Sequence, residues 1–222
     1  MKTNVLIVMA LSVLIVTSCK KQEIETTPRA SLQITNAVVG AGSLQFGTNV
    51  AVIANNSFNA YGVFAGNRQV KLVMQATPNA VLYGKTSDFV NGGLYSLFLA
   101  GTPSAVESVM VKEDNIITHT DNVFGIRFIN LSVGSGPISI NIHDANAGSL
   151  VPSLAYKALS GFNSLSAQAE EGAKVFEFRN AETGALVSSF TVPDYDIPRF
   201  RNITLVYAGN AANPVVFRVN NY

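Results

Sequence analysis

The feature that most constrains the fold is an internal repeat of short apolar segments joined by glycine-containing turns. Residues 32–46 align with residues 126–140, and residues 94–101 align with residues 202–209. The first match has a spacing of 94 (126 − 32) and the second a spacing of 108 (202 − 94). The second copy therefore carries 14 extra residues (108 − 94), which we expect in its loops, within residues 144–198.

The segments themselves have the pattern of β-strands. Six runs alternate apolar and polar residues with the period of two that puts one strand face on a core and the other in water. These runs are residues 31–38, 69–74, 125–131, 138–142, 174–179 and 202–207. Gly, Asn, Ser and Pro separate them, and regular short strands of this kind predict an all-β sandwich or barrel. We expect at most one helical turn, at residues 167–171.

The repeat predicts two tandem modules, residues 30–117 and 122–222, joined by the polar stretch 113–122. Each module has about 100 residues, a usual size for an immunoglobulin-like β-sandwich. Such a module closes its own strands, so we expect each to bury its own core. The alternative is one continuous sandwich in which strands from both halves share a sheet.

The amino terminus has the pattern of a bacterial lipoprotein signal. Lys2 precedes an apolar stretch at residues 5–16, which is shorter than the roughly 20 residues of a membrane span. Val-Thr-Ser then precedes Cys19 and resembles the lipobox, where the cysteine is acylated and the signal is cut before it. We therefore expect a signal peptide at residues 1–18 and a lipidated Cys19 with a tether at residues 19–29. The alternative is a plain signal peptide with an incidental cysteine.

The expected lipid anchor predicts a cell-envelope location. A multiply acylated terminus binds a membrane stably, because each buried methylene contributes about 0.8 kcal/mol. We expect the outer membrane. Glu23 and Glu25 weakly resemble an acidic surface-export signal, but Lys20 and Lys21 oppose it, so the surface and periplasmic faces both stay open.

Three features together resemble the envelope family called domain of unknown function 4397. They are an opening strand that ends in an Asn-containing turn, the segment 61–66 before the strand at 69–74, and a late strand that ends in Ala-Gly. The resemblance spans nearly the whole chain after the tether, in two copies, with the pattern degraded around residues 162–172. It implies tandem immunoglobulin-like modules on bacterial lipoproteins and secreted proteins. The family brings no catalytic residues to this chain.

Charge and cysteine content argue against several function classes. The chain has 15 basic and 14 acidic residues, and removal of Lys2 with the signal peptide leaves 14 of each. A balanced chain has no electrostatic footprint for nucleic acid. Its single cysteine excludes a disulfide framework and a multi-cysteine metal site. The two histidines, His119 in the seam and His143 at a strand end, accompany no nucleophile elbow, and we expect both to be solvated. We expect no cofactor, no metal centre and no enzymatic activity.

Two groups of residues are candidates for ligand binding. Asp194, Tyr195 and Asp196 lie between two prolines, and two carboxylates at i and i+2 can begin a calcium site. The alternative is an exposed turn. The chain has no Trp, so aromatic contacts to a glycan would fall to tyrosines near loops, namely Tyr83 and Tyr195.

The leading functional hypothesis is a non-enzymatic envelope lipoprotein whose β modules serve adhesion, scaffolding or binding of a surface partner. The alternative is a glycan-binding accessory of a nutrient-uptake system. Both hypotheses share the membrane as a partner through the lipid anchor, and they differ in whether the second partner is a surface protein or a glycan.

Overall fold

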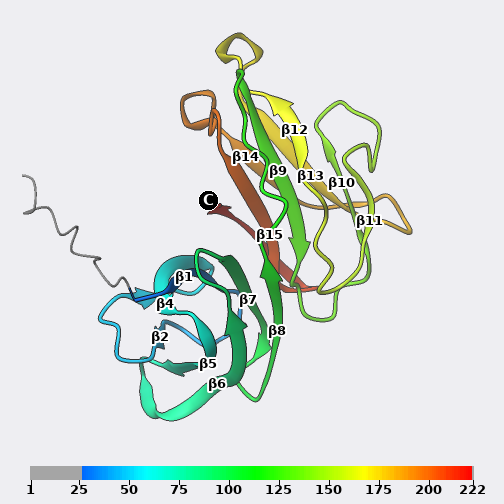
Figure 1. Cartoon of the computed structure of the whole chain (residues 1–222). Coiled ribbons are helices and arrows are strands. Elements are labelled where there is room, and N and C mark those ends of the chain that lie inside the picture. Colours follow the sequence, from blue (N-terminus) through cyan, green and yellow to red (C-terminus); the bar gives the residue numbers. More distant parts are fainter. Residues whose placement is uncertain (1–26, 222) are drawn as a thin grey trace, which may run out of the picture.

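The computed structural model describes residues 27–221, and Figure 1 shows that they form two bodies built from β-strands. The all-β prediction is confirmed. The expected signal peptide 1–18, the lipidation site Cys19 and the tether as far as residue 26 lie outside the described residues. Strand β1 begins at Arg29, so the last residue of the expected tether belongs to the first module.

Module 1 is a sandwich of two four-stranded sheets. Sheet A has the order β4-β1-β7-β8 and sheet B the order β3-β2-β5-β6. The strands are β1 (Arg29–Asn36), β2 (Leu44–Phe46), β3 (Val52–Ile53), β4 (Ser57–Phe64), β5 (Gly66–Met74), β6 (Thr77–Phe89), β7 (Leu94–Thr102) and β8 (Ala105–Lys112).

Module 2 repeats this arrangement strand for strand. Sheet C has the order β12-β9-β15-β16 and sheet D the order β11-β10-β13-β14. The strands are β9 (Val123–Asn130), β10 (Ile138–Ile142), β11 (Val151–Leu154), β12 (Asn163–Ser166), β13 (Lys174–Asn180), β14 (Leu186–Val192), β15 (Asn202–Asn210) and β16 (Asn213–Asn220). Within residues 27–221 each of the four sheets takes its strands from one half of the chain, so the alternative of a shared sheet is wrong.

The strand registers confirm the two spacings of the repeat. In sheet A, β1 and β7 are parallel with Ser31 opposite Leu94, and in sheet C, β9 and β15 are parallel with Gly125 opposite Asn202. Equivalent residues of the two modules are thus 94 positions apart in the opening strands (125 − 31) and 108 positions apart in the late strands (202 − 94). The hairpin from β10 to β11 holds seven of the 14 extra residues. Its paired residues Ile138 and Leu154 are 16 positions apart (154 − 138), whereas the equivalent Leu44 and Ile53 of module 1 are 9 positions apart (53 − 44). The other seven lie between β11 and β15, where the 3-10 turns η1 (Ala169–Glu171) and η2 (Asp194–Asp196) occur.

The repeated Ala-Gly at the end of the late strand has a steric cause. Gly101 and Gly209 adopt φ values of +84° and +81°. A Cβ on Gly101 would lie 2.2 Å from the carbonyl oxygen of Ala105, and one on Gly209 would lie 2.4 Å from that of Asn213. Only glycine fits these tight hairpins, so the motif belongs to the fold.

The repeated Asn at the end of the opening strand is a buried staple. The Oδ1 atom of Asn36 accepts a hydrogen bond from the Val38 amide at 3.3 Å, and its Nδ2 donates to the carbonyls of Gly42 and Ile53 at 2.8 and 3.3 Å. Asn130 makes the three equivalent bonds in module 2. Each amide thus ties the end of one sheet to strands of the facing sheet.

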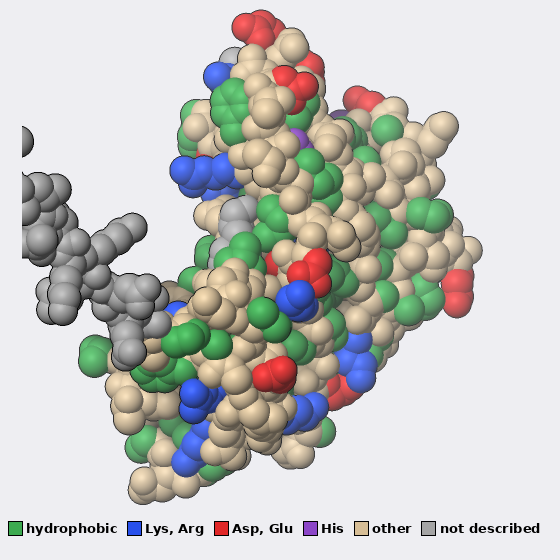
Figure 2. Space-filling model, viewed as in Figure 1, with side chains coloured by type: hydrophobic (Ala, Val, Ile, Leu, Met, Phe, Trp, Pro, Cys, Tyr) green, Lys and Arg blue, Asp and Glu red, His purple; other side chains and the backbone are tan. Residues whose placement is uncertain are grey.

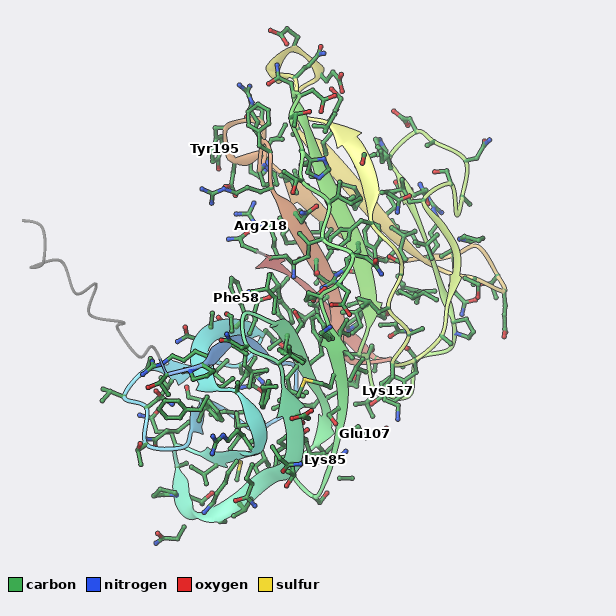
Figure 3. All side chains as sticks on the ribbon, viewed as in Figure 1. Phe58, Lys85, Glu107, Lys157, Tyr195 and Arg218 are labelled. Carbon is green, nitrogen blue, oxygen red and sulfur yellow. The ribbon has the colours of Figure 1, made fainter. Side chains whose placement is uncertain are left out.

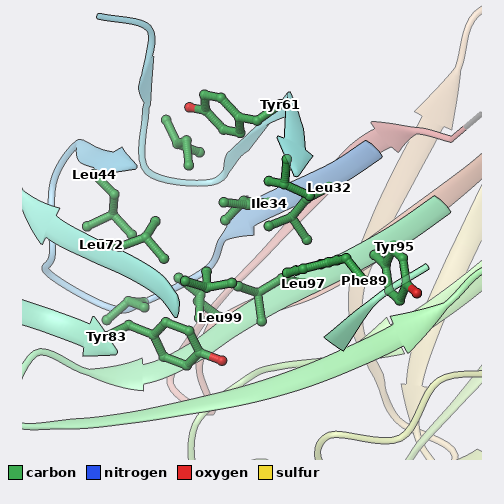
Figure 4. Packing of buried hydrophobic residues seen from close by; sticks show 14 of the residues in the cluster. Leu32, Ile34, Leu44, Tyr61, Leu72, Tyr83, Phe89, Tyr95, Leu97 and Leu99 are labelled. Carbon is green, nitrogen blue, oxygen red and sulfur yellow. The ribbon is translucent and has the colours of Figure 1, made fainter. Parts of the chain in front are cut away.

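Each module has its own apolar core between its two sheets. In module 1 the core contains side chains from sheets A and B, among them Leu32, Leu72 and Leu97 (Figure 4). In module 2 four aromatic rings form much of the core. They are Phe128, Phe176, Phe178 and Tyr207.

A third apolar cluster lies between the modules, where sheet A packs on sheet C. It corrects the expectation that strand runs 31–38, 125–131 and 202–207 each have one face in water, because both faces of β1, β9 and β15 are mostly buried. The parallel central strands of sheets A and C are covered on both sides, as parallel strands usually are.

Equivalent positions of the two modules build this interface. The matched positions are Ala37 with Leu131, Phe98 with Val206, Ala100 with Ala208, Phe58 with Leu159, Val109 with Phe217, and Val111 with Val219. An interface in which the same patch of two bodies meets itself is the isologous type found in twofold dimers. The chain therefore resembles a dimer of one module with its two copies joined covalently.

Candidate functional site

The seam between the modules is packed against them. Glu113 follows β8, and its carboxylate makes a bidentate pair with Arg127 of β9, with oxygen–nitrogen distances of 2.5 and 2.9 Å. Their side chains are 3% and 5% exposed. Arg127 also donates from Nε to Thr204 at 2.9 Å. The seam thus contributes a buried latch where the sequence predicts a solvated linker.

His119 in the seam is also buried, which corrects its expected solvated position. Its side chain Nε2 lies 3.0 Å from Oδ1 of Asn202, and Nδ2 of Asn202 donates to the Ile117 carbonyl at 2.7 Å. Gly125 makes room for this contact, because a Cβ there would lie 1.9 Å from the Asn202 oxygen. His119 therefore holds the seam on module 2.

A cavity of about 440 Å³ lies beside this latch. Its wall includes Ile117, Leu159 and Phe162, and the Arg127 guanidinium stacks 4.6 Å from the Phe162 ring centre. The charged groups of this wall, Arg127 and Glu113, already satisfy each other. The cavity therefore presents mainly apolar surface at the join of the modules.

A second cavity lies at one end of module 2, where the connection from β14 to β15 passes beside β16. We call it the arginine cleft, and its volume is about 300 Å³. It is lined by Tyr195, Asp196, Ile197, Pro198, Arg199, Arg201, Arg218 and Asn220. Figure 3 shows Tyr195 and Arg218 on the same side of module 2, and Figure 2 shows basic side chains gathered on that side.

The structure brings two of the three predicted loop residues into this cleft. Asp196 pairs with Arg218, which is 2.8 Å from its carboxylate and also donates to its backbone carbonyl at 3.1 Å. Asp194 accepts a hydrogen bond from the Tyr195 amide at 2.8 Å, which shapes the turn. Calcium binding by this loop stays a prediction, and the pairing with Arg218 competes with it for the Asp196 carboxylate.

Two further arginines line the cleft with no protein partner for their charge. Within residues 27–221 no hydrogen bond or ion pair involves the guanidinium of Arg199 or of Arg201, and both residues are exposed. Three guanidinium groups thus meet one lining carboxylate, that of Asp196. The cleft therefore carries an excess of positive charge.

Phe200, between these two arginines, holds a strained backbone conformation. Its φ is +60°, in the left-handed region that a bulky residue rarely adopts. Its amide donates to the Val123 carbonyl at 2.9 Å, and the Arg201 carbonyl accepts from Gly125 at 2.9 Å. These two bonds to β9 fix the loop in place despite the strain.

The two candidate tyrosines differ completely in exposure. Tyr83 is 6% exposed and belongs to the core of module 1 (Figure 4), so the prediction of Tyr83 as an aromatic contact is wrong. Its position in β6 places its side chain on the inner face of sheet B. Tyr195 is 89% exposed at the rim of the arginine cleft, and its ring remains a candidate contact.

A polar cluster covers the outer face of sheet D. Glu177 of β13 accepts from His143 Nδ1 at 2.7 Å, from Arg179 at 2.6 Å and from Asn141 at 3.0 Å. These bonds, led by the one from His143, lower the pKa of Glu177 to about 2. The same hydrogen bond, with the charge of Asp144 nearby, raises the pKa of His143. His143 is thus solvent-accessible, as predicted, but it is paired.

The described residues contain neither a metal-ligand cluster nor a membrane-spanning helix. Residues 27–221 contain no group of three or more His, Cys, Asp or Glu side chains placed to hold a metal ion. In the same range no helix is long and apolar enough to cross a membrane.

The three arginines of the cleft were not predicted from the sequence. Arg199 and Arg201 lie within three residues after Pro198, so two basic residues beside the predicted turn were a readable signal. Arg218 is 22 residues from Asp196 in the sequence (218 − 196), and only the fold of β16 brings it to the turn.

No family model matches the chain, and a search of the curated proteins finds no significant match. The resemblance to the domain of unknown function 4397 family therefore stays a prediction.

Proposed function

We propose that the protein is a non-enzymatic, lipid-anchored envelope protein that binds a surface partner through module 2. The observation that carries the proposal is the arginine cleft, which a lengthened connection builds at the end of a β-sandwich. Loops on a rigid scaffold are where binding groups concentrate. The lipobox-like sequence before Cys19 supports the anchor, and the family resemblance supports an immunoglobulin-like reading of the modules.

The packing between the modules supports a scaffolding role. The apolar cluster between sheets A and C and the latch of Glu113 with Arg127 join the modules over their central strands. Tyr156 and Lys157 of module 2 also bind Glu107 of module 1. A body joined in this way holds the cleft in a fixed orientation relative to module 1.

Tyr195 favours the second candidate, a glycan-binding accessory of a nutrient-uptake system. Its exposed ring at the rim of a concave, polar cleft is suited to contact with the face of a sugar. Both candidates use the same cleft, and they differ in the chemistry of the partner.

Fractionation of cells tests the anchor. Replacing Cys19 by Ser removes the only thiol of the chain, so we expect the protein to leave the membrane fraction as an unprocessed or soluble form. Ser12→Ala, within the apolar stretch, is the control and should change neither mass nor fraction. Unchanged mass and fractionation of Cys19→Ser would refute the lipoprotein proposal.

A glycan array tests the nature of the partner. Under the accessory hypothesis the protein binds defined glycans, and Tyr195→Ala loses that binding while Tyr83→Phe, in the core, keeps it. An array on which the protein binds nothing favours a surface protein as the partner.

A further inference from the structure

We propose that the arginine cleft binds the carboxylate groups of an acidic, uronate-containing polysaccharide. This inference rests on the proposed binding function of module 2 and names the class of its ligand.

The charge of the cleft points to an anion. Like charges that line one cleft repel each other, and Asp196 neutralises only Arg218. Arg199 and Arg201 remain without a carboxylate or carbonyl partner among the described residues. A bound anion would supply the missing acceptors.

The residue type favours a carboxylate. A guanidinium is a planar fork that donates two parallel hydrogen bonds to a carboxylate, and such charge-assisted pairs are the strong ones. Arg218 is already held by the carboxylate and the carbonyl of Asp196, so it forms a fixed wall. Arg199 and Arg201 are then the side chains available to the ligand.

The remaining lining favours a sugar as the carrier of the carboxylate. Tyr195 exposes its ring at the rim, and the cleft between it and Arg218 is concave and mainly polar. At about 300 Å³ the cleft is at the small end of ligand sites, so it fits one charged unit of a longer chain.

The backbone conformation of the loop at Phe200 is of the kind found at binding sites. Phe200 holds a left-handed conformation between the two free arginines, although it is half exposed and its ring contributes little to the core. Strained residues cluster at binding sites, where the surrounding structure holds them. Two prolines flank the turn and limit its freedom, which lowers the entropy lost on binding.

The experiment uses the full chain, purified in detergent, in calorimetric titrations. The ligands are oligomers of galacturonate, glucuronate and mannuronate, each beside its methyl ester, which keeps the sugar and removes the charge. Inorganic phosphate and vesicles with anionic headgroups are the alternative anions. We expect at least one oligomer to bind and its ester to bind at least about tenfold more weakly.

Variants then locate the binding. Arg199→Gln with Arg201→Gln should weaken binding at least about tenfold without lowering the melting temperature, because neither guanidinium has a protein partner. Arg68→Gln with Lys71→Gln, on module 1, removes the same charge and should leave the affinity within about twofold. Tyr195→Ala should weaken binding of the oligomer and leave phosphate unaffected.

Several results would overturn the proposal. These are equal binding of the ester, unchanged binding by the double arginine variant, and binding of vesicles or phosphate without any oligomer. Failure of every oligomer and anion to bind would also overturn it. None of these results changes the Cys19→Ser fractionation, so the ligand class and the anchor fail separately.

Discussion

The two modules solve the same packing problem with different chemistry at equivalent positions. In module 1, Gln33 of β1 lies in the interface and exchanges hydrogen bonds with the end of β16, at Asn220 and Asn221. The equivalent contact joins Arg127 of module 2 to Glu113, which follows β8 of module 1. Arg127 is equivalent to Gln33 (127 − 33 is 94), and Asn221 is equivalent to Glu113 (221 − 113 is 108). The comparison teaches that the sheet contact requires satisfied polar groups at this position and tolerates either a neutral or a charged pair.

The modules differ again at the end where β7 and β15 begin. In module 1 the preceding connection is residues 90–93, and in module 2 it is residues 193–201. Gly92 and Phe200 are equivalent and both donate from the backbone to the first part of β1 or β9, at 2.8 and 2.9 Å. Where module 1 has a short glycine turn, module 2 has a longer, arginine-bearing loop on the same sandwich. The two loops differ in length and charge, while the strand order is the same.

Separating the modules should have the largest effect on the molecule. A cut between Asn115 and Ile116 leaves Glu113 with module 1 and His119 with module 2. Each fragment keeps its own core but exposes an apolar sheet face that contains Phe98 or Val206. We expect the two fragments to associate and to elute together in size-exclusion chromatography.

A matched variant sharpens that result. Phe98→Asp in the fragment of module 1 should abolish the association, whereas Phe64→Asp, at an exposed position outside the interface, should not. Fragments that elute separately as folded monomers would show that the interface contributes little.

Breaking the buried latch should have the next largest effect. Glu113→Ala leaves the guanidinium of Arg127 buried without its charge partner, which we expect to lower the free energy of unfolding by about 3–5 kcal/mol. The exposed pair of Lys112 with Asp114 is the control, and Asp114→Ala should leave the free energy of unfolding nearly unchanged, because exposed ion pairs contribute little. Urea unfolding of the full chain measures both.

The comparison of modules also supplies a rescue. Glu113→Asn with Arg127→Gln gives module 2 the neutral pair that module 1 has, and most of the lost stability should return. A double variant as unstable as Glu113→Ala would contradict the equivalence of the two pairs.

The repeated staples should have a smaller and symmetrical effect. Asn36→Ala and Asn130→Ala each leave a buried amide and buried carbonyls without partners, which costs about 1–3 kcal/mol. We expect similar losses in the two modules, measured by urea unfolding. Asn49→Ala, whose exposed side chain donates to the Phe46 carbonyl, is the control. A large loss at one asparagine alone would show that the staples are not equivalent.

Much of the fold was predictable because the repeat is carried by backbone requirements. Gly101, Gly209, Asn36 and Asn130 satisfy local needs of turns and strand ends, so they remain visible in the sequence. The interface was not predictable from alternation, because the outer faces of β1 and β9 mix small, polar and apolar side chains. The continuous apolar run of β7, from Leu97 to Ala100, was the readable sign of a strand buried on both faces.

The candidate site was only partly predictable. The turn at residues 194–196 was found because its residue types are local, and Tyr195 and Asp196 do line the cleft. Arg218 comes from another strand and needs the tertiary fold. Tyr83 was misplaced because strand β6 extends through it, so a position that looked close to a loop is in fact in the core.

Relieving the strain at the cleft should raise stability modestly. Phe200 and Gly92 are equivalent, with φ values of +60° and +75°. Phe200→Gly gives the loop the residue that suits this conformation, and the freer unfolded chain offsets part of the relieved strain, so we expect a gain of up to about 1 kcal/mol in the free energy of unfolding. The converse change, Gly92→Phe, should lower stability by a similar amount. A loss of stability in Phe200→Gly would mean that the half-exposed ring contributes more than the strain costs.

The smallest expected effect is a pH dependence that belongs to module 2 alone. Glu177 has Lys71 as its counterpart in module 1 (177 − 71 is 106, the shift between β5 and β13), so only sheet D carries the His143 and Glu177 pair. The pKa of Glu177 is lowered from 4.5 to about 2, so its contribution to stability is complete above pH 4.5 and is lost as the pH falls toward 2. The pKa of His143 is raised from 6.5, so its contribution is complete below pH 6.5 and is lost as the pH rises through the raised value.

Variants of the pair assign these two limbs to their residues. In urea unfolding across this pH range, Glu177→Gln should lose the acid limb and most of the alkaline limb, because the shared hydrogen bond is the largest cause of both pKa shifts. His143→Asn should lose the alkaline limb and keep part of the acid limb, because Arg179 and Asn141 still donate to Glu177. Asp144→Asn is the control for the second charge near His143, and it should keep most of the alkaline limb, because the hydrogen bond to Glu177 is the larger cause of the raised pKa. An alkaline limb that survives in His143→Asn would show that it does not belong to the His143 and Glu177 pair.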